Sequence, residues 1–277
     1  MPDNREVEVR YHMLRPEQIV ARRKECPVAY IPIGTLEWHG VHNPLGADTL
    51  QAEGIAIRCA QEGGGLAFPP LYYGESRSEA LMEANAGDRH LIAEKMGLSP
   101  ENFNPEKLPF TPTEQVLNYN KLLLHILAEA ETLGFKVGVL VAGHYPLIDH
   151  ARAAALLFNQ RRYGNKERML AWAFVDYALV DDKFPIAGDH AGGWETSHVM
   201  ALHPQTVDLS LLPPRGEPLI GVGFRIDPRD STAEFGNETI EAAVDVAIKE
   251  VRHRLENPGR YFSHGRSLQE RKWEDGS

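Results

Sequence analysis

Four short hydrophobic runs along the chain have the length and the residue types of buried β-strands. They lie close to Pro, Gly or polar breaks and alternate little, which is typical of strands covered on both faces of a parallel sheet. The sequence therefore predicts strands at Pro27–Gly34, Leu66–Leu71, Val137–Ala142 and Met169–Val175. The first and third runs carry the strongest signal because they are rich in Val and Ile.

Between and after these runs, hydrophobic residues recur at about 3.6-residue spacing, which predicts amphipathic helices. The predicted helices are Thr49–Glu62, Thr113–Leu133, Leu147–Tyr163, Trp194–Leu202 and Thr239–Leu255. We expect Asn237 or Thr239 to cap the last of them, since both residue types can accept a hydrogen bond from a free N–H group of the first turn.

Strands that alternate with helices indicate parallel βαβ units, and hence an α/β fold whose sheet is covered by helices on both faces. In such sheets the functional residues gather just beyond the carboxyl ends of the strands. Residues 76–110 are polar and interrupted by Pro and Asn. We interpret them as an insertion or lid within a single domain that spans residues 1–277.

Composition narrows the class of protein. Of the 277 residues 43% are hydrophobic, the net charge is −10, and the two cysteines, Cys26 and Cys59, lie in or beside apolar segments, as core thiols do. The acidic charge, without a basic stripe interleaved with aromatics, argues against nucleic acid as a partner. No apolar run approaches the ~18 residues that a membrane span needs. The N-terminus lacks the apolar region of a signal peptide, so we expect a cytoplasmic protein with no membrane partner.

The segment 34–48, GTLEWHGVHNPLGAD, concentrates Glu37, His39, His42 and Asp48 in a loop that follows the first predicted strand. Carboxylate and imidazole together suit Zn²⁺, Mn²⁺ or Fe²⁺, and glycines let such a loop turn several ligands toward one point. Glu37 and His39 are two residues apart, so in an extended chain they point the same way. The alternative interpretation is a polar loop in which Asp48 only caps the following helix.

Two further segments place polar residues at the same predicted edge of the sheet. His144 follows the strand Val137–Ala142, where a histidine can be a ligand or a hydrogen-bonded structural residue. The segment 188–197, GDHAGGWETS, carries Asp189, His190 and Glu195, and Glu195 can be either a ligand or an acid favoured by the dipole of its helix. Together the segments offer enough ligands for two metal ions about 3.5–4 Å apart.

The same segments resemble the creatininase (creatinine amidohydrolase) family. The first signature of that family, P-x-G-[ST]-x-E-x-H-G-x-H-L-P-x-x-[TS]-D, is similar to residues 32–48, PIGTLEWHGVHNPLGAD. Its Gly-His strand end is similar to Ala142–Tyr145, AGHY, and its H-A-G-x-x-E-T-S segment to His190–Ser197, HAGGWETS. The matching segments extend from residue 27 to about residue 210 in the family's order.

The resemblance implies a three-layer α/β/α sandwich with a mostly parallel central sheet and a binuclear metal site. By position, Glu37 and His144 would bind one ion, His39 the other, and Asp48 would bridge them. His190 would face the substrate as a proton donor. We assign substrate contacts to His42, Tyr145 and Trp194, which lie within the matching segments. The family also implies a homo-oligomer, for which a hexamer is one form.

One position departs from the family's pattern. In creatininase proper the Gly-His-Tyr is followed by a Glu that binds the second ion, whereas here Pro146 offers no side-chain oxygen. Glu195 is therefore expected to supply the missing ligand and to take part in catalysis, and creatinine is expected to be a poor substrate.

The sequence thus predicts a metal-dependent hydrolase of a C–N bond in a cyclic or linear small-molecule amide, with about two divalent ions (Zn, Mn or Fe) in each subunit. A non-catalytic metal-binding protein that retains the fold, and a metal-dependent isomerase or lyase, remain as alternatives.

Overall fold

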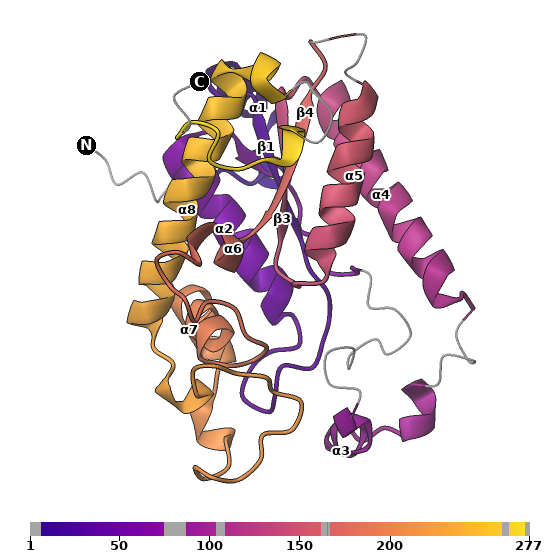
Figure 1. Cartoon of the computed structure of the whole chain (residues 1–277), viewed down its shortest axis with the longest axis vertical. Coiled ribbons are helices and arrows are strands. Elements are labelled where there is room, and N and C mark those ends of the chain that lie inside the picture. Colours follow the sequence, from indigo (N-terminus) through magenta and orange to yellow (C-terminus); the bar gives the residue numbers. More distant parts are fainter. Residues whose placement is uncertain are drawn as a thin grey trace.

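A parallel sheet of four strands in the order β2-β1-β3-β4 forms the centre of the structure, a computed structural model (Figure 1). It describes residues 7–74, 87–103, 109–161, 165, 167–261 and 266–274. The strands are β1 (Val28–Ile33), β2 (Leu66–Ala67), β3 (Val137–Ala142) and β4 (Leu170–Val175), and every neighbouring pair is parallel. The predicted strands are confirmed, but β2 is shorter than expected because Pro69 and Pro70 follow it and have no N–H group to donate.

Alternate residues of the strands face two separate hydrophobic cores. Tyr30, Val139 and Phe174 contribute to one core. Their neighbours in the sequence, such as Ile31 and Leu140, contribute to the other. Both faces of the sheet are therefore buried, as expected from the near-continuous apolar runs.

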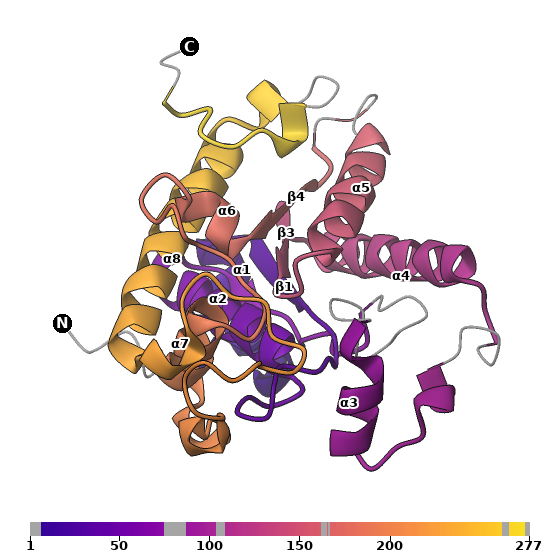
Figure 2. The same cartoon turned by 60° about the horizontal axis from the view of Figure 1, so that its bottom comes forward.

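Helices cover both faces, which gives the expected three layers (Figures 1 and 2). On one side lie α2 (Ala47–Gly63), α6 (Asp176–Val180), α7 (Gly193–Leu202) and α8 (Ala233–Glu256). On the other side lie α4 (Pro112–Thr132) and α5 (Leu147–Gln160). The remaining helices are α1 (Pro16–Glu25) and α3 (Arg89–Lys95), with short 3₁₀ turns between elements, among them η4 (Pro100–Phe103). None of the described helices is long and apolar enough to cross a membrane.

The five predicted helices are present, but the predicted start of the last one was wrong. Helix α8 begins at Ala233, and Thr232 caps it by accepting the N–H of Phe235 at 3.1 Å. Asn237 and Thr239 lie inside the helix. The segment contains Gly236, a poor helix former, but α8 passes α7 so closely there that a Cβ on Gly236 would lie 2.0 Å from the carbonyl oxygen of Ser197. Helix packing outweighs the low propensity of Gly at this position.

The described part of the predicted insertion packs against the segment that follows β1. Ile92, Ala93 and Phe103, from α3 and η4, form a small buried cluster with Trp38. The rest of the 76–110 segment includes residues 76–86 and 104–108, which lie outside the described residues. Whether the chain is a single domain stays a prediction.

The strand order creates a switch point between β1 and β3. From β1 the chain continues through α2 to β2 on one side, and from β3 it continues through α5 to β4 on the other. The two strands end in register, with Ile33 opposite Ala142. Ligand sites of open parallel sheets form in the crevice at such a point, because the loops there diverge. The segments that carry Glu37 and His144 both start at this crevice.

Candidate metal centre

Glu37 and His39 lie in the loop between β1 and α2. The backbone N–H of Glu37 donates to the carbonyl of Leu45 at 2.9 Å, which closes the loop on itself. The side chains of Glu37 and His39 are buried, with 1% and 0% of their surface exposed. The Nδ1 atom of His39 lies 3.1 Å from the Glu37 carbonyl oxygen, so a proton on Nδ1 leaves Nε2 free to bind. Nε2 points to the carboxylates described next.

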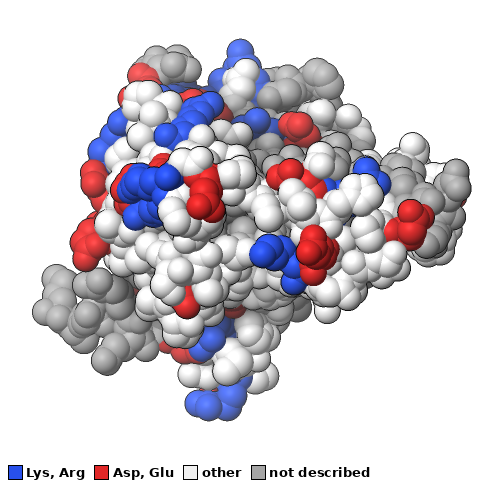
Figure 3. Space-filling model, turned by 90° about the horizontal axis from the view of Figure 1, so that it is seen from below, with Lys and Arg blue, Asp and Glu red and all other residues white. Residues whose placement is uncertain are grey.

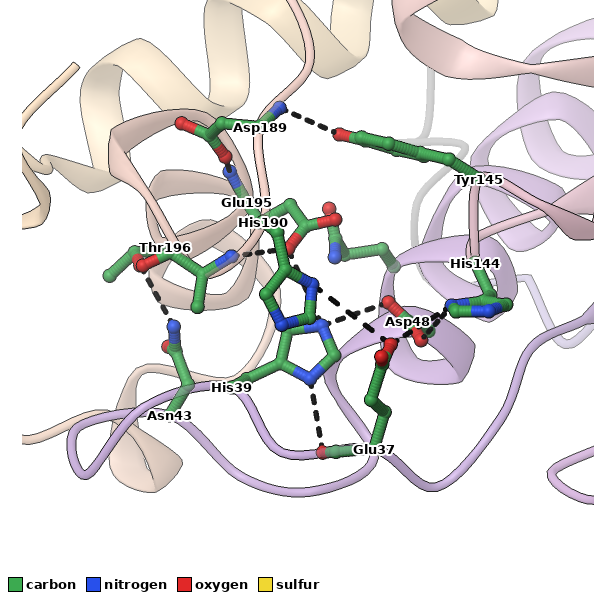
Figure 4. A network of polar contacts seen from close by, with 12 residues as sticks. Glu37, His39, Asn43, Asp48, His144, Tyr145, Asp189, His190, Glu195 and Thr196 are labelled. Carbon is green, nitrogen blue, oxygen red and sulfur yellow. Dashed lines mark hydrogen bonds and ion pairs between the residues drawn. The ribbon is translucent and has the colours of Figure 1, made fainter. Parts of the chain in front are cut away.

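Asp48 lies in the first turn of α2, where its two oxygens face different histidines (Figure 4). Oδ1 is 3.0 Å from Nε2 of His39, and Oδ2 is 3.2 Å from Nδ1 of His144. Burial alone would raise the pKa of Asp48, but the positive charge of His39 and hydrogen bonds from both histidines hold this pKa well below its usual range. The helix starts after Gly46 with no side-chain cap. The geometry therefore favours a ligand over the capping role that the sequence left open.

His144 follows β3, and Nδ1 of its ring lies 3.0 Å from Oε2 of Glu37. Gly143 precedes it and donates its N–H to the carbonyl of Ile33 at 2.9 Å, so the end of β3 is held against the end of β1. This pairing brings a residue from each strand end to the same point, as the switch-point rule predicts.

The third segment contributes Glu195 from the first turn of α7. Its Oε2 lies 3.4 Å from Nε2 of His39 and accepts the backbone N–H of Ala191 at 2.8 Å. The N–H groups of Trp194 and Glu195, which open the helix, donate to the two oxygens of Asp189 at 2.9 and 3.2 Å. Asp189 is thus the residue that caps α7. Glu195 does not cap its own helix, and its carboxylate faces the centre.

His190 is the most exposed member of the cluster, with 17% of its side chain exposed. Its Nε2 lies 2.9 Å from the carbonyl oxygen of Trp38, which can only accept, so Nε2 carries a proton. Nδ1 points toward Oε2 of Glu37 at 3.9 Å. The ring lies against that of His39, with 4.5 Å between centroids.

Among the described residues, the possible ligand atoms form three groups, and two of these groups share Asp48. One contains Glu37, Asp48 and His144, and the other contains His39, Asp48 and Glu195. Within each group the ligand atoms lie within 4.8 Å of one another. Each group offers three protein ligands of the types that Zn²⁺, Mn²⁺ and Fe²⁺ accept.

The charge of this donor set fits bound cations. Three carboxylates, those of Glu37, Asp48 and Glu195, are at most 2% exposed. Buried charges are costly unless they are compensated. In the absence of a cation the compensation comes from protons: although burial would lower the pKa of His39, Asp48 and Glu195 raise it well above its usual value. A divalent ion would replace such protons.

The three residues assigned to substrate contacts lie beside this cluster and outside its ligand groups. His42 is buried, and its Nε2 lies 3.1 Å from the carbonyl oxygen of Ala191, so the ring ties the first segment to the third. The hydroxyl of Tyr145 accepts the N–H of Asp189 at 3.4 Å. Trp194 has no exposed surface, and its indole donates to Asp176 at 2.9 Å. Substrate binding by these residues stays a prediction, and the buried position of Trp194 does not support it.

Sequence reasoning did not single out two residues that organise the site. Asp176 follows β4 directly and is buried between the indole of Trp194 and the ring of His198. Trp38 lies between two candidate ligands and packs away from them. The only signal for Asp176 was its place after a predicted strand, and for Trp38 it was a large apolar residue in a polar loop.

The fold and the buried carboxylate–histidine cluster define the class of protein as a metal-dependent hydrolase on an α/β/α scaffold. Residues 12–251 match the family model described as creatinine amidohydrolase. The chain belongs to the creatininase family and is a metal-dependent amidohydrolase of that family.

Individual relatives agree with this assignment. The chain is 28% identical over 221 residues to the creatinine amidohydrolase of Pseudomonas putida. The aligned region covers 74% of this chain and 76% of that protein. A solved mutant creatininase of the Zn-Zn type matches with a TM-score of 0.64 at 22% identity, over 91% of this chain and 99% of the other. A structure described as creatininase Mn gives the same TM-score and identity, over 91% and 100%. At these identities the structures support the fold.

Proposed function

We propose that this protein hydrolyses a C–N bond in a cyclic or linear amide at a binuclear metal site. The observation that carries the proposal is the division of Asp48 between two ligand groups, with Oδ1 toward His39 in one and Oδ2 toward His144 in the other. A bridging carboxylate of this kind is the usual feature of two-metal hydrolytic sites. When bound, such ions supply a water of lowered pKa and polarise a carbonyl oxygen.

Glu37, His144 and Asp48 would hold one ion, and His39, Glu195 and Asp48 the other. Their burial excludes bulk water, which strengthens every electrostatic interaction at the site. Glu195 takes the place of the ligand that Pro146 cannot provide. Zn and Mn forms of creatininase match this fold, which supports these two ions as the first to test.

His190 would donate the proton to the leaving nitrogen. Because Nε2 donates to the carbonyl of Trp38, any proton delivered to a substrate leaves from Nδ1, which points toward Glu37. Its partial exposure allows contact with an entering molecule, whereas the other five side chains of the ligand groups are buried. A general acid of this kind contributes about 10²–10⁴-fold to a rate.

The described surface at this end of the molecule carries charges of both signs. Figure 3 views the molecule from the end where α3 and α7 lie, and positive and negative side chains are interspersed on the described part of that face. We expect creatinine to be turned over poorly, because Pro146 removes a ligand that creatininase uses for its own reaction. Assembly into a homo-oligomer stays a prediction.

The deciding experiment combines metal analysis with an activity screen. The purified protein is stripped with a chelator, reloaded with Zn²⁺, Mn²⁺ or Fe²⁺, and assayed on formamides, lactams, cyclic ureas, creatinine and short peptides. Ion-dependent hydrolysis of at least one amide, by ring opening of a cyclic amide or by release of an amine from a linear one, would support the proposal if it is absent in Asp48→Ala. Tight ion binding without hydrolysis of any amide would favour the non-catalytic alternative or a lyase or isomerase.

A further inference from the structure

Trp38 occupies an unusual place, since its two sequence neighbours are candidate ligands while its own side chain points away from them. Only 5% of its surface is exposed. The indole packs on Ile92, Ala93 and Phe103 of the insertion, with Val41, Leu45, Met96 and Ile220 around this cluster. The ligand-bearing loop is thus attached by Trp38 to a segment that supplies no ligand group among the described residues.

Two polar contacts add to this attachment. The indole Nε1–H donates to the carbonyl of Ile220 at 2.9 Å, and the carbonyl of Trp38 itself accepts from Nε2 of His190 at 2.9 Å. Trp38 is therefore bonded at its side chain to the segment before Gly223 and at its backbone to His190. The ring of His190 cannot rotate without losing the second bond.

The segment around Gly221 is fixed by the insertion as well. The N–H of Gly221 donates to Oδ2 of Asp88, just before α3, at 2.8 Å. Gly221 has a φ of +60°, and a Cβ there would lie 2.6 Å from Cδ1 of Trp38 and 2.9 Å from Cδ1 of Ile92. Only glycine combines this backbone conformation with so close an approach. Two residues further, Gly223 pairs with His190 through N–H···O bonds of 2.6 and 2.9 Å.

These contacts form one closed circuit. It runs from α3 to the indole of Trp38, through the Trp38 backbone to His190, through Gly223 to Gly221, and back to α3 at Asp88. A ligand loop that is not held in the binding geometry must lose conformational entropy when an ion binds. A loop held by such a circuit has already lost it, so ion affinity and proton transfer both gain from the insertion.

We propose that Trp38 is a positioning residue of the metal centre, and that α3 of the insertion, through Ile92 and Asp88, sets the ion affinity of the Glu37–His39 loop and the orientation of His190. This inference rests on the proposed metal site. It gives the 87–103 segment a role in the site, although none of its residues belongs to a ligand group.

The simpler explanation is that the cluster around Trp38 only stabilises the fold. The two differ in what an altered α3 does to ion binding by protein that remains folded. Ile92 is fully buried against Trp38, whereas its neighbour Leu91 is 47% exposed on the same helix. Ile92→Ala and Leu91→Ala are therefore a matched pair: both shorten an aliphatic side chain of α3, and only Ile92 belongs to the buried cluster around Trp38.

The test measures Co²⁺ and Zn²⁺ affinity of the full chain by competition with a chromophoric chelator, the visible absorption of the Co²⁺ form, and the thermal unfolding of the ion-free form. Loss of an outer-shell partner typically weakens ion binding about 10- to 100-fold. We expect Ile92→Ala to bind at least about tenfold more weakly, with an altered Co²⁺ spectrum, while Leu91→Ala stays within about twofold of the wild type.

Asp88 gives an independent arm in case Ile92→Ala does not fold. Asp88→Ala removes the acceptor of the Gly221 N–H and should weaken ion binding, whereas Asp88→Asn keeps an acceptor oxygen and should restore it. Wild-type affinity and Co²⁺ spectra in both Ile92→Ala and Asp88→Ala would overturn the inference and leave the proposed function standing. A wild-type protein that binds neither ion would overturn both.

Discussion

The carbonyl oxygen of Asp48 lies against Gly143 so closely that a Cβ on Gly143 would come within 1.8 Å of it. Gly143 directly follows β3 and precedes His144, and Asp48 lies in the first turn of α2. The missing side chain lets the start of the helix settle on the end of the strand, which brings Oδ2 of Asp48 to 3.2 Å from His144. The lack of a side chain at Gly143 therefore allows Asp48 and His144 to lie together at the candidate metal centre.

Gly143→Ala should separate these two elements. A Cβ cannot occupy space 1.8 Å from a carbonyl oxygen, so α2 or the end of β3 must shift. We expect a loss of about 1–3 kcal/mol in the free energy of unfolding, as for other overpacked sites, and at least about tenfold weaker ion binding. Gly259→Ala is the control, because a Cβ there meets nothing within 4 Å. Equal ion affinity in both variants would contradict this account of Gly143.

Asp48→Ala should remove both ions from the protein, because each of its oxygens belongs to a different ligand group. His144→Ala should remove only the ion held with Glu37. Metal content per chain after dialysis, measured by mass spectrometry, distinguishes the variants: about two ions for the wild type, one for His144→Ala and none for Asp48→Ala. Two tightly held ions in Asp48→Ala would show that Asp48 does not bridge.

The layers of the fold could be predicted from the sequence because strands that are buried on both faces are apolar along their whole length. The runs that became β1 and β3 are apolar at every position, and both strands are fully buried. Helix α1 was not predicted, since it has no buried residues and so lacks the recurring apolar positions on which the helix predictions were based. Helix α3 was missed for a related reason, because only Ile92 and Ala93 of its short span are buried.

The residues of the candidate site were predicted from the sequence itself, and their grouping around two ions only from the family resemblance. Motif positions identified Glu37, His39, Asp48, His144 and Glu195, and the structure brings their side chains together. The choice between capping and binding for Glu195 could not be made from spacing, because either role needs an acid in the first turn of α7. It depends on Asp189, which accepts the N–H groups of that turn and so occupies the cap.

Buried His198 should make stability fall in acid. Burial lowers the pKa of His198 from 6.5 to about 3, so the folded protein keeps the ring neutral while the unfolded chain binds a proton below about 6.5. The unfolded state then holds more protons, and the wild type should lose about 1 kcal/mol per pH unit relative to His198→Gln as the pH falls from 6 to 4.

Urea unfolding of the ion-free proteins at several pH values measures this difference. Asp176 contacts His198, and burial raises its pKa to about 6, an effect of opposite sign on stability. Asp176 is present in both proteins, so the part of its contribution that does not depend on His198 cancels in the comparison. His125→Gln is the matched control, because that side chain is 66% exposed. A difference in unfolding free energy between the wild type and His198→Gln that does not change with pH would contradict the lowered pKa of His198.

Glu195→Gln should remove the second ion without unfolding α7. Oε2 of Glu195 lies 3.4 Å from Nε2 of His39. Without this carboxylate, the ion in the group of His39, Asp48 and Glu195 would keep only two protein ligands. Catalytic sites usually have about three. A neutral amide is a weak ligand for a divalent ion but still accepts a hydrogen bond, so the Ala191 N–H keeps a partner. We expect one ion per chain, more than about 100-fold weaker binding of the second, and loss of turnover.

Asp189→Asn supplies the contrast, since Asp189 caps α7 and touches no ion ligand atom directly. Asparagine keeps one acceptor oxygen for these two N–H groups, so Asp189→Asn should cost less than Asp189→Ala, which should cost about 1 kcal/mol of stability, as lost N-caps do. If Glu195 were only a helix acid, Glu195→Gln would resemble Asp189→Asn, with both ions retained and a small change in stability. If it is a ligand, the two variants differ in metal content while their unfolding curves stay close. The comparison of metal content at equal stability therefore decides between the two roles that the sequence left open.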